Sequence, residues 1–518
     1  MTCNISDLLR PQLDGPGANL LDAHEVRAAW KKHLAGGLEA PRHLYLHIPF
    51  CRQRCSYCCY YSVPSGGGPA VEEYLASLHR AMRFFAPVFA KTPFQTLYIG
   101  GGTPSLLTPD QMTRLLEAVY TLYRFEDGGQ RTVECNPLSV TKEKLAVLEK
   151  SEINRISMGV QSLNRTPLAS ENRGYQDAGS VGRAVRLVRE AGDFRLNLDL
   201  LLGMKTDDGK SFLRTFDAIM RLEPDEVTVY TITPMNDYLE KFYSGDPALF
   251  RAHLRDRFKE VPLAVRDQAR ARIHLTQSAP SLDDHAWHFS GGARQSRFNY
   301  DDFSPEPASV LGLGPSSRSR AAGVLAYTEN IRLPALFDPK KKVYRARRLT
   351  LRDEMVKFLV VRICNDIEGV ASRFAETFGV EIEAAFPAEV EALREDGLLT
   401  GSGARLAFRP RSADERGRCA AGFAAPRGLT LVFPSGRCHL RVEPLRYGRR
   451  YLAQTGDLGL LASEEGSLGP RPLARRRLLA ALFLKAANVR PAAGARDVAD
   501  EYARLLEEVA PTLGAQAR

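Results

Sequence analysis

The sequence predicts an α/β protein whose main domain is an open, parallel (β/α)6 partial barrel. Three observations predict this fold: six short β-rich runs recur between residues 44 and 233, helical patterns separate them, and the alternation stops after Pro234. Strands that alternate with helices indicate βαβ units and therefore a parallel sheet. Because a closed barrel of this kind needs eight units, six units predict a partial barrel.

The predicted elements follow one another in a regular order. Apolar residues at helical spacing predict helices over 71–88, 110–123 and 181–190. The β-rich runs are short and lie between these helical patterns. The six predicted strands are 44–48, 94–99, 132–135, 155–158, 196–201 and 226–233.

The rest of the chain differs in character from the barrel. Residues 237–330 show no regular alternation and predict substrate-facing loops. Helical patterns over 351–365, 370–378 and 384–395, with a hairpin through 401–403, predict a winged-helix-like module. Residues 410–426 are rich in Arg, Gly and Ala and predict a linker. Two β-like runs, 429–433 and 438–442, precede further helical stretches in an α+β tail.

This pattern predicts five segments. They are an N-terminal arm (1–40), the partial barrel (41–235), a barrel extension with substrate-facing loops (236–345), the winged-helix-like module (346–408) and a C-terminal extension of unassigned role (409–518).

The composition is that of an ordinary globular protein. The chain has 518 residues, of which 44% are hydrophobic and 25% charged, and no uninterrupted apolar run of membrane-span length. Its formal charge of +10 comes from scattered arginines, so the charge itself does not indicate nucleic-acid binding. The N-terminus has neither a basic region nor an apolar region of the secretory type. We therefore expect the protein to be located in the reducing cytoplasm.

Three cysteines, Cys51, Cys55 and Cys58, form a C-x3-C-x2-C run at the end of the first predicted strand. In barrels of parallel strands, reacting groups lie at the C-terminal strand ends. Three thiolates can bind three irons of a [4Fe–4S] cluster and leave the fourth iron open to a small chelating molecule. The spacing therefore predicts an iron–sulfur site that performs chemistry.

Zinc binding and a disulfide framework are two other interpretations of the cysteines. Zinc would need a fourth ligand, and Cys59 would have to supply it although adjacent residues rarely point at one metal. A disulfide framework does not suit a long chain without secretory features. Iron–sulfur binding is the interpretation that needs no further ligand.

Polar or glycine-rich motifs stand at the ends of the following strands. Tyr57, before the third cysteine, offers a flat ring against which a purine can stack. Gly100, Gly101 and Gly102 let the backbone approach a ligand closely, for example the amino group of a chelated methionine. The polar residues Glu134, Gln161 and Asp199 stand at the ends of the third, fourth and fifth strands, where Asp199 could accept both hydroxyls of a ribose.

In chain order these motifs resemble the radical S-adenosylmethionine (SAM) enzymes built around oxygen-independent coproporphyrinogen III oxidase. That family shares H-I-P-F-C-x3-C-x2-C, G-G-G-T-P-S, E-x-N-P, R-x-S-x-G-V-Q-S and D-L-x-x-G, which all occur between residues 44 and 204. Residues 350–399 resemble the family's C-terminal module more weakly. The fold expected from the resemblance is the partial (β/α)6 radical SAM barrel.

The resemblance implies a cofactor set and roles for particular residues. It implies a [4Fe–4S] cluster, SAM and an external electron donor such as flavodoxin or ferredoxin. Cys51, Cys55 and Cys58 would bind the cluster, and Arg173 would pair with the SAM carboxylate. The remaining expected SAM contacts are Gly101, Gly102 and Thr103 at the amino end, and Glu134, Gln161 and Asp199 along the site.

Three departures from the family bear on the substrate. Tyr60 stands where the oxidases have a further cysteine, and the stretch Arg297 to Phe303 lacks the heme-binding histidine of the related chaperones. The G-L-G-P-S form from Gly312 to Ser316 looks more like methyltransferases and cyclopropanases that hold two SAM molecules. We therefore expect C-methylation or cyclopropanation of a small molecule, with the coproporphyrinogen oxidase, an anaerobic heme-degrading enzyme and a heme chaperone as alternatives.

Overall fold

The computed structural model divides the chain into two compact units. One unit contains the described residues up to 365 together with 376–379, and the second contains 367–375 and the described residues from 380 onward. The structure describes residues 19–36, 40–64, 68–270, 274–275, 286–290, 306–329, 337–365, 367–411, 413–424, 429–433, 436–445, 448–455 and 459–464.

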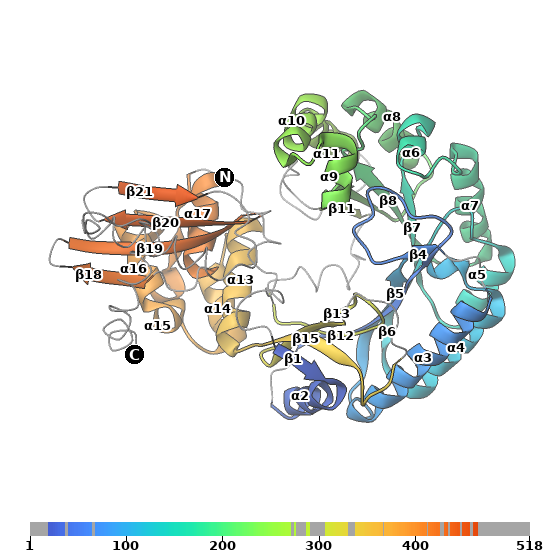
Figure 1. The fold of residues 1–518 in the computed structure, drawn as a ribbon, viewed down its shortest axis with the longest axis horizontal. Helices are drawn as coiled ribbons and strands as arrows, with labels where there is room; N and C mark the ends of the chain where they lie inside the picture. The colour runs from blue at the N-terminus through green and yellow to red at the C-terminus, as the bar shows by residue number, and fades with distance from the viewer. Residues whose placement is uncertain are drawn as a thin grey trace, which may run out of the picture. The chain divides into compact units, whose positions relative to one another are not determined.

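A curved sheet forms the core of the first unit. Its six central strands are parallel and follow chain order from β2 to β9, which confirms all six predicted strands. Figure 1 shows the helices along the outer side of this curve. The loop between β3 (Phe50–Cys51) and β4 (Val63–Pro64) lies on its inner side. The central strands are β2 (Arg42–Ile48), β5 (Phe94–Gly101), β6 (Phe125–Cys135), β7 (Arg155–Gln161), β8 (Arg195–Leu202) and β9 (Glu226–Thr231).

Five of the six helices between these strands begin at residues whose side chains cap them, whereas α3 has no side-chain cap. Thr108 forms a capping box with Gln111 at the start of α4, and Asp177 and Asp208 accept backbone N–H groups at the starts of α7 and α8. Their apolar faces bury against the sheet. These helices are α3 (Pro69–Phe85), α4 (Pro109–Leu122), α5 (Lys142–Lys150), α6 (Arg165–Ser170), α7 (Ala178–Ala191) and α8 (Gly209–Met220).

The prediction that 237–330 is irregular was wrong for much of the part that the structure describes. Three helices follow β9, because Phe250, Leu254 and Phe258 repeat at four-residue spacing and bury one helical face. Proline at the start of α10 suits the first turn of a helix. The helices are α9 (Asn236–Tyr243), α10 (Pro247–Phe258) and α11 (Val261–Arg270). The stretch Arg297 to Phe303 lies outside the described residues.

Further strands extend both edges of the sheet. At one edge β11 pairs antiparallel with β9, and at the other β12 pairs parallel with β2. The described residues of the predicted N-terminal arm are part of this unit, since β1 pairs with β15 and Trp30 Nε1 of α2 donates to the Tyr327 hydroxyl at 2.8 Å. The added elements are β1 (Asn19–Asp22), α2 (Ala23–Ala35), β10 (His274–Leu275), β11 (Ala286–Ser290), β12 (Ser309–Leu313), β13 (Arg318–Ala321), β14 (Leu325–Glu329) and β15 (Val343–Arg348).

The winged-helix-like pattern is present as helices followed by a short hairpin. Helices α13 (Leu351–Asn365) and α14 (Val370–Phe378) have the predicted bounds. The third predicted helix is broken into α15 (Ile382–Ala385) and α16 (Pro387–Glu395), because Pro387 forces Phe386 out of helical geometry. Strands β16 (Leu399–Thr400) and β17 (Ala407–Phe408) form the predicted hairpin.

The linker prediction for 410–426 was wrong. Residues 413–424 form helix α17 (Ala413–Ala424), and its buried Cys419, Ala420 and Phe423 lie on one face. The Phe423 ring contacts those of Phe386 and Phe408 edge-on. The helical spacing of these small and aromatic residues indicates a helix, whereas the linker prediction considered only the Arg, Gly and Ala content of the segment.

A four-stranded antiparallel sheet follows α17 in the second unit. Its first two strands, β18 (Leu429–Phe433) and β19 (Gly436–Leu445), confirm the two predicted β-like runs. Two more strands, β20 (Gly448–Thr455) and β21 (Gly459–Glu464), follow, although the sequence predicted helical stretches after the second run. The rest of that predicted helical part, beyond residue 464, lies outside the described residues. Cys438 lies in β19. Within the described part of the chain, no helix has the length and apolar character that crossing a membrane requires.

Candidate functional site

The three cysteines lie on a loop that leaves β2 through the short strand β3 (Phe50–Cys51) and ends at β4 (Val63–Pro64). Backbone hydrogen bonds tie this loop to its surroundings. Gly102 N donates to Ile48 O at 2.8 Å and Thr103 N to Phe50 O at 2.7 Å, while Ser56 N donates to Glu171 O at 3.1 Å. The cysteine loop is therefore fixed against both the glycine motif at the end of β5 and the turn after α6.

Each of the three thiols has a polar neighbour. The Thr103 hydroxyl donates to Cys51 Sγ at 3.5 Å, and Arg173 Nη1 donates to Cys55 Sγ at 3.8 Å. The Cys58 thiol donates to the Tyr60 carbonyl at 3.8 Å. All three cysteines are free of disulfides, Cys55 is buried, and Cys59 is exposed.

This donor set fits an iron–sulfur cluster. Iron–sulfur clusters are held by cysteine thiolates and tuned by hydrogen bonds to sulfur, which Thr103 and Arg173 already supply. Burial raises the pKa of Cys51 and raises that of Cys58 to about 12, so these thiols need a metal or a cation nearby to ionise. Among the described residues, no three His, Cys, Asp or Glu side chains are arranged to bind a single metal ion.

The glycine motif packs so closely that side chains are excluded. Gly101 has φ +111°, and a Cβ there would lie 2.7 Å from the ring of His47. A Cβ on Gly102 would lie 2.7 Å from the Phe50 carbonyl oxygen, which is backbone and cannot move aside by a rotamer change. The glycines are therefore needed for the contact between this motif and the cysteine loop.

We expect Gly102→Ala to lower stability by about 1–3 kcal/mol, because the new Cβ must push apart two backbone segments. The variant should also retain less iron after anaerobic reconstitution, since the displaced segment begins the cysteine loop. Thermal unfolding and iron analysis check both effects. Gly182→Ala is the matched control, because the nearest atom to its Cβ is a flexible arginine nitrogen at 3.8 Å. Equal unfolding temperatures for the two variants would contradict this prediction.

Glu134 at the end of β6 is held by the glycine motif and by Tyr98. Gly101 N donates to Glu134 Oε2 at 3.0 Å, and the Tyr98 hydroxyl donates to Oε1 at 2.8 Å. Burial raises the pKa of Glu134, against the opposing effect of these two donors. The carboxyl is thus positioned beside Gly101, as the predicted SAM site requires.

Asp199 on β8 lies in a similar environment. Ser157 Oγ donates to Asp199 Oδ2 at 3.0 Å and Asn197 Nδ2 to Oδ1 at 2.7 Å. Burial, followed by the nearby Glu134 carboxyl, raises the pKa of Asp199 to about 7. The interior of the barrel therefore holds two carboxyl groups that resist ionisation together.

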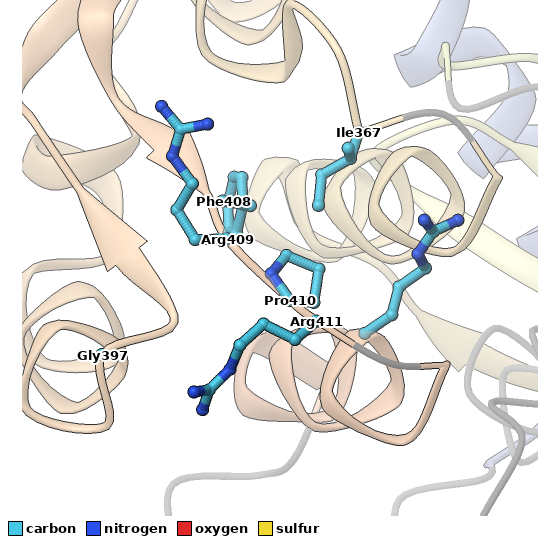
Figure 2. A pocket seen from close by; sticks show the side chains of 7 residues that line it. Ile367, Gly397, Phe408, Arg409, Pro410 and Arg411 are labelled. Atoms are coloured by element: carbon cyan, nitrogen blue, oxygen red, sulfur yellow. The ribbon is translucent and has the colours of Figure 1, made fainter.

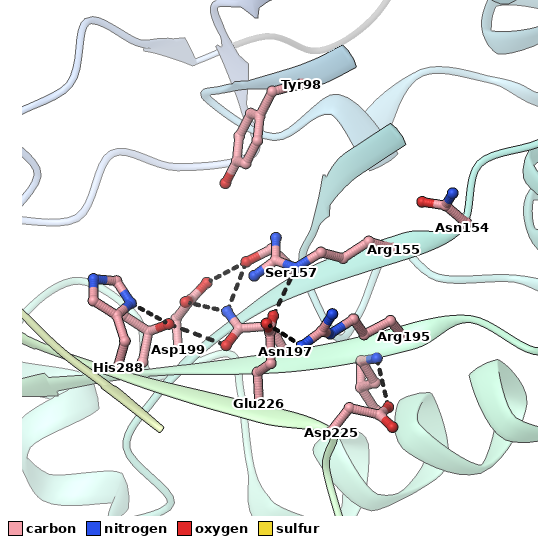
Figure 3. A network of polar contacts seen from close by, with 12 residues as sticks. Tyr98, Asn154, Arg155, Ser157, Arg195, Asn197, Asp199, Asp225, Glu226 and His288 are labelled. Atoms are coloured by element: carbon pink, nitrogen blue, oxygen red, sulfur yellow. Dashed lines mark hydrogen bonds and ion pairs between the residues drawn. The ribbon is translucent and has the colours of Figure 1, made fainter. Parts of the chain in front are cut away.

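A polar network fills the barrel interior behind Asp199 (Figure 3). Glu226 on β9 accepts from Arg155 Nε at 2.7 Å and pairs with Arg195 Nη2 at 2.9 Å. Thr228 Oγ1 donates to Asn197 Oδ1 at 3.0 Å and lies 3.4 Å from His288 Nδ1. These contacts join β7, β8, β9 and β11, so they fix the strands that present Asp199.

The other predicted SAM residues lie at the same end of the barrel. Arg173 is buried, and besides Cys55 it donates to the Gly159 carbonyl and to Gln176 Oε1. Gln161 ends β7 with φ +70°, and Tyr57 packs partly buried against the core. The structure thus brings the predicted residues together around the cysteine loop, but the sequence did not point to Tyr98, Ser157, Asn197 or Gln176 as their supports.

The G-L-G-P-S stretch has a visible packing role. Gly314 follows β12 with φ +104°, and a Cβ there would lie 2.8 Å from the His47 carbonyl oxygen. The Tyr74 hydroxyl donates to the same carbonyl. The stretch therefore lies against the end of β2, next to the start of the cysteine loop.

The second unit contains a cavity that none of the predicted site residues lines. Its volume is about 540 Å³, and Figure 2 shows arginine side chains around it. Arg411 pairs with Glu415 at 3.0 Å. The lining residues are Ile367, Gly397, Phe408, Arg409, Pro410, Arg411 and Arg416.

Comparison with known proteins finds similarity in the part of the chain that contains the cysteine loop and the predicted SAM residues. Residues 45–219 match the family model for the radical SAM superfamily. The oxygen-independent coproporphyrinogen III oxidase of Salmonella typhimurium is 26% identical over 400 residues, which cover 72% of this chain and 83% of that protein. The heme chaperone HemW of Bacillus subtilis is 25% identical over 368 residues, which cover 69% of this chain and 92% of that protein.

A solved structure shows the same fold. The coproporphyrinogen III oxidase HemN of Escherichia coli aligns with a TM-score of 0.61 at 20% identity, over 76% of this chain and 93% of that one. At this identity the similarity concerns the fold. Residues 45–219 therefore form a radical SAM domain, in a protein that resembles oxygen-independent coproporphyrinogen III oxidases and HemW heme chaperones.

Proposed function

We propose that this protein is a radical SAM oxidoreductase that acts on a carboxylate-bearing tetrapyrrole of the coproporphyrinogen type. One observation supports the radical chemistry above others: three free thiols lie on one loop, and Thr103 and Arg173 donate to two of them beside Gly101 and Glu134. Cys51, Cys55 and Cys58 would hold a [4Fe–4S] cluster there, and when bound it would supply the electron for the reductive cleavage of SAM into methionine and a 5′-deoxyadenosyl radical.

The residues of the chain would bind and orient SAM. Gly101, Gly102 and Thr103 offer close backbone approach at its amino end, and Arg173 offers a cation for its carboxylate. Glu134 and Asp199 offer carboxylates that Tyr98, Ser157 and Asn197 hold in place. Tyr57 offers a ring for the adenine, and Gln161 an amide at the end of β7. Such fixed donors and acceptors keep the reacting groups aligned.

The proposed substrate class, a tetrapyrrole, is based on the names of the similar proteins. It replaces the C-methylation or cyclopropanation that the sequence predicted. C-methylation or cyclopropanation with a second SAM is not supported, because the relatives that align over most of their own length are named coproporphyrinogen III oxidases and heme chaperones. We therefore favour oxidative decarboxylation. The 5′-deoxyadenosyl radical would take one hydrogen atom from a propionate side chain, carbon dioxide would leave, and the remaining electron would pass to an external one-electron acceptor. The Tyr60 side chain is half exposed. Desolvation by the surrounding protein raises the pKa of its hydroxyl, and the nearby Cys59 and Glu134 raise this pKa further. A neutral phenol thus stands where the oxidases have a cysteine.

A heme chaperone is the second candidate. The observation that favours it is the alignment with the Bacillus subtilis HemW, which extends over 92% of that protein. A chaperone would bind heme tightly and release no product.

Incubation of the reconstituted, reduced enzyme with coproporphyrinogen III and SAM tests the proposal. We expect carbon dioxide and 5′-deoxyadenosine together, and no transfer of label from methyl-labelled SAM to a product. Label in a non-protein product would support C-methylation or cyclopropanation instead. Tight heme binding without any product would favour the chaperone, and either outcome would overturn the proposed reaction.

SAM binding should depend on pH through Asp199. Its pKa of about 7 means that the carboxyl becomes protonated as the pH falls through 7, and a protonated carboxyl accepts from ribose hydroxyls less well. Between pH 8 and pH 6 the ionised fraction falls about tenfold, and we expect the dissociation constant for SAM to rise by a similar factor. Calorimetric titration at several pH values measures it. Asp199→Asn should bind weakly at both pH values; an unchanged pH dependence in this variant would contradict the assignment.

A further inference from the structure

Three exposed cations surround the cysteine loop. Arg52 and Arg54 lie on the loop between the first and second cysteines, and Lys241 lies on α9. The chain from residue 41 to residue 71 contains no Asp or Glu. The loop that would hold the cluster is therefore positively charged on its own.

Contacts with neutral groups tie the three cations to this loop. Lys241 Nζ donates to Ser56 Oγ at 2.7 Å and lies 3.4 Å from the Ser170 carbonyl oxygen. Arg54 Nη2 donates to the Cys58 carbonyl at 3.5 Å, and Arg52 lies 5.8 Å from the centre of the Tyr175 ring. The three side chains thus flank the segment that runs from Cys51 to Cys58. We name Arg52, Arg54 and Lys241 the basic rim.

No carboxylate neutralises the basic rim through an ion pair within the described part of the chain. Asp237 and Glu240 are exposed on the same helix as Lys241, yet neither pairs with it. Lys241 does lie near the buried Glu171, whose pKa is raised by burial and lowered to a lesser degree by Tyr238, Lys205 and Lys241. The charge of the rim therefore remains available to a partner.

The position of the rim indicates what that partner does. The thiols of Cys51 and Cys55 meet Thr103 and Arg173 on the inner side of the loop, whereas Arg52, Arg54 and Lys241 are exposed to solvent. A donor that reaches the cluster from outside must approach across the exposed side. Clusters of like charge steer an oppositely charged protein to such a place.

We propose that Arg52, Arg54 and Lys241 form the docking surface for an acidic one-electron carrier protein that reduces the cluster. The inference rests on the proposed function, because it assumes a cluster on Cys51, Cys55 and Cys58. In each encounter the carrier loses one electron and the cluster gains one. No bond forms or breaks, and the carrier leaves in its oxidised state.

The test uses the full-length, reconstituted protein and a flavodoxin in its hydroquinone state as the acidic carrier. Arg52→Gln/Arg54→Gln/Lys241→Gln removes three charges with little change in volume. Arg83→Gln/Arg186→Gln/Lys210→Gln is the matched control, which removes three charges from α3, α7 and α8. Binding of oxidised flavodoxin is measured by titration, and the rate of cluster reduction by stopped-flow absorption at several salt concentrations.

At low salt we expect the rim variant to bind flavodoxin at least about tenfold more weakly than the wild type, and flavodoxin to reduce its cluster at least about tenfold more slowly. At high salt its reduction rate should approach that of the wild type. The control variant should follow the wild type. Reduction by photoreduced deazaflavin, a small molecule that needs no docking surface, should be equal in all three proteins. This equality shows that the cluster itself is unharmed.

Two results would overturn the docking surface. One is a rim variant that binds flavodoxin and is reduced by it like the wild type. The other is a rim variant whose affinity for SAM falls while its affinity for flavodoxin is unchanged, since the rim would then serve an anionic small molecule. A wild-type protein that holds no reducible cluster would instead refute the proposed function, so the two failures are distinguishable.

Discussion

Replacing Cys51, Cys55 and Cys58 together by alanine is expected to abolish iron binding. The protein should contain background iron after anaerobic reconstitution and should lack the broad visible absorption of an iron–sulfur centre. The reason is that these three thiols are the donor set of the loop, and iron–sulfur clusters depend on cysteine thiolates. Because the loop is also tied by backbone hydrogen bonds to Gly102 and Thr103, the fold should survive the change.

Iron analysis and visible spectroscopy check this expectation. Cys59→Ala is the matched control, because Cys59 stands next to Cys58 but is exposed. It should retain the iron content and absorption of the wild type. Unchanged iron in the triple variant would show that the metal is held elsewhere. Loss of iron in the Cys59 variant would indicate a four-cysteine site of the structural zinc type instead.

The second large effect concerns the ion pairs inside the barrel. Glu226→Gln leaves two arginines, Arg155 and Arg195, without their shared carboxylate, and Arg155 and Glu226 are almost fully buried. Removing one partner of a buried pair leaves an uncompensated charge in the interior. We expect a loss of about 3–5 kcal/mol in the free energy of unfolding.

Urea unfolding followed by tryptophan fluorescence measures this loss well. The chain has two tryptophans, Trp30 and Trp287, and both are buried in the barrel unit. Asp217→Asn serves as the control, because it breaks an exposed pair with Arg221 on α8 and should cost less than about 1 kcal/mol. Similar unfolding midpoints for the two variants would show that the interior pair contributes little.

Local patterns predicted the barrel because they are repeated and strong. Helix α3 and the six parallel strands follow from apolar spacing and turn residues. Helix α13 has its predicted bounds because its apolar residues, among them Met355, Phe358 and Leu359, are buried. Strand β6 begins seven residues earlier than predicted, at Phe125 against 132. The polar Asp127 and the two glycines after it resemble a turn. They lie between Phe125 and Gln130, which pair with Phe94 and Thr96 of β5, where the register of the two strands shifts.

The chemistry of the site was easier to predict than its supports. The cysteines and the glycine motif are recognised by spacing in one segment of chain. Tyr98 and Asn197 hold Glu134 and Asp199 through contacts that depend on strand register, such as Glu134 opposite Ser157. Register across parallel strands joins residues that are far apart in sequence. A single sequence does not display it.

We propose that this chain cleaves SAM reductively at its cysteine loop. The most direct measurement is the release of 5′-deoxyadenosine and methionine by the anaerobically reconstituted protein with a strong reductant. We predict that the two products form in equal amounts, only in the presence of reductant, and not in the variant that lacks Cys51, Cys55 and Cys58. A reconstituted protein that contains the cluster and binds SAM, yet releases no 5′-deoxyadenosine on reduction, would refute reductive SAM cleavage at this loop.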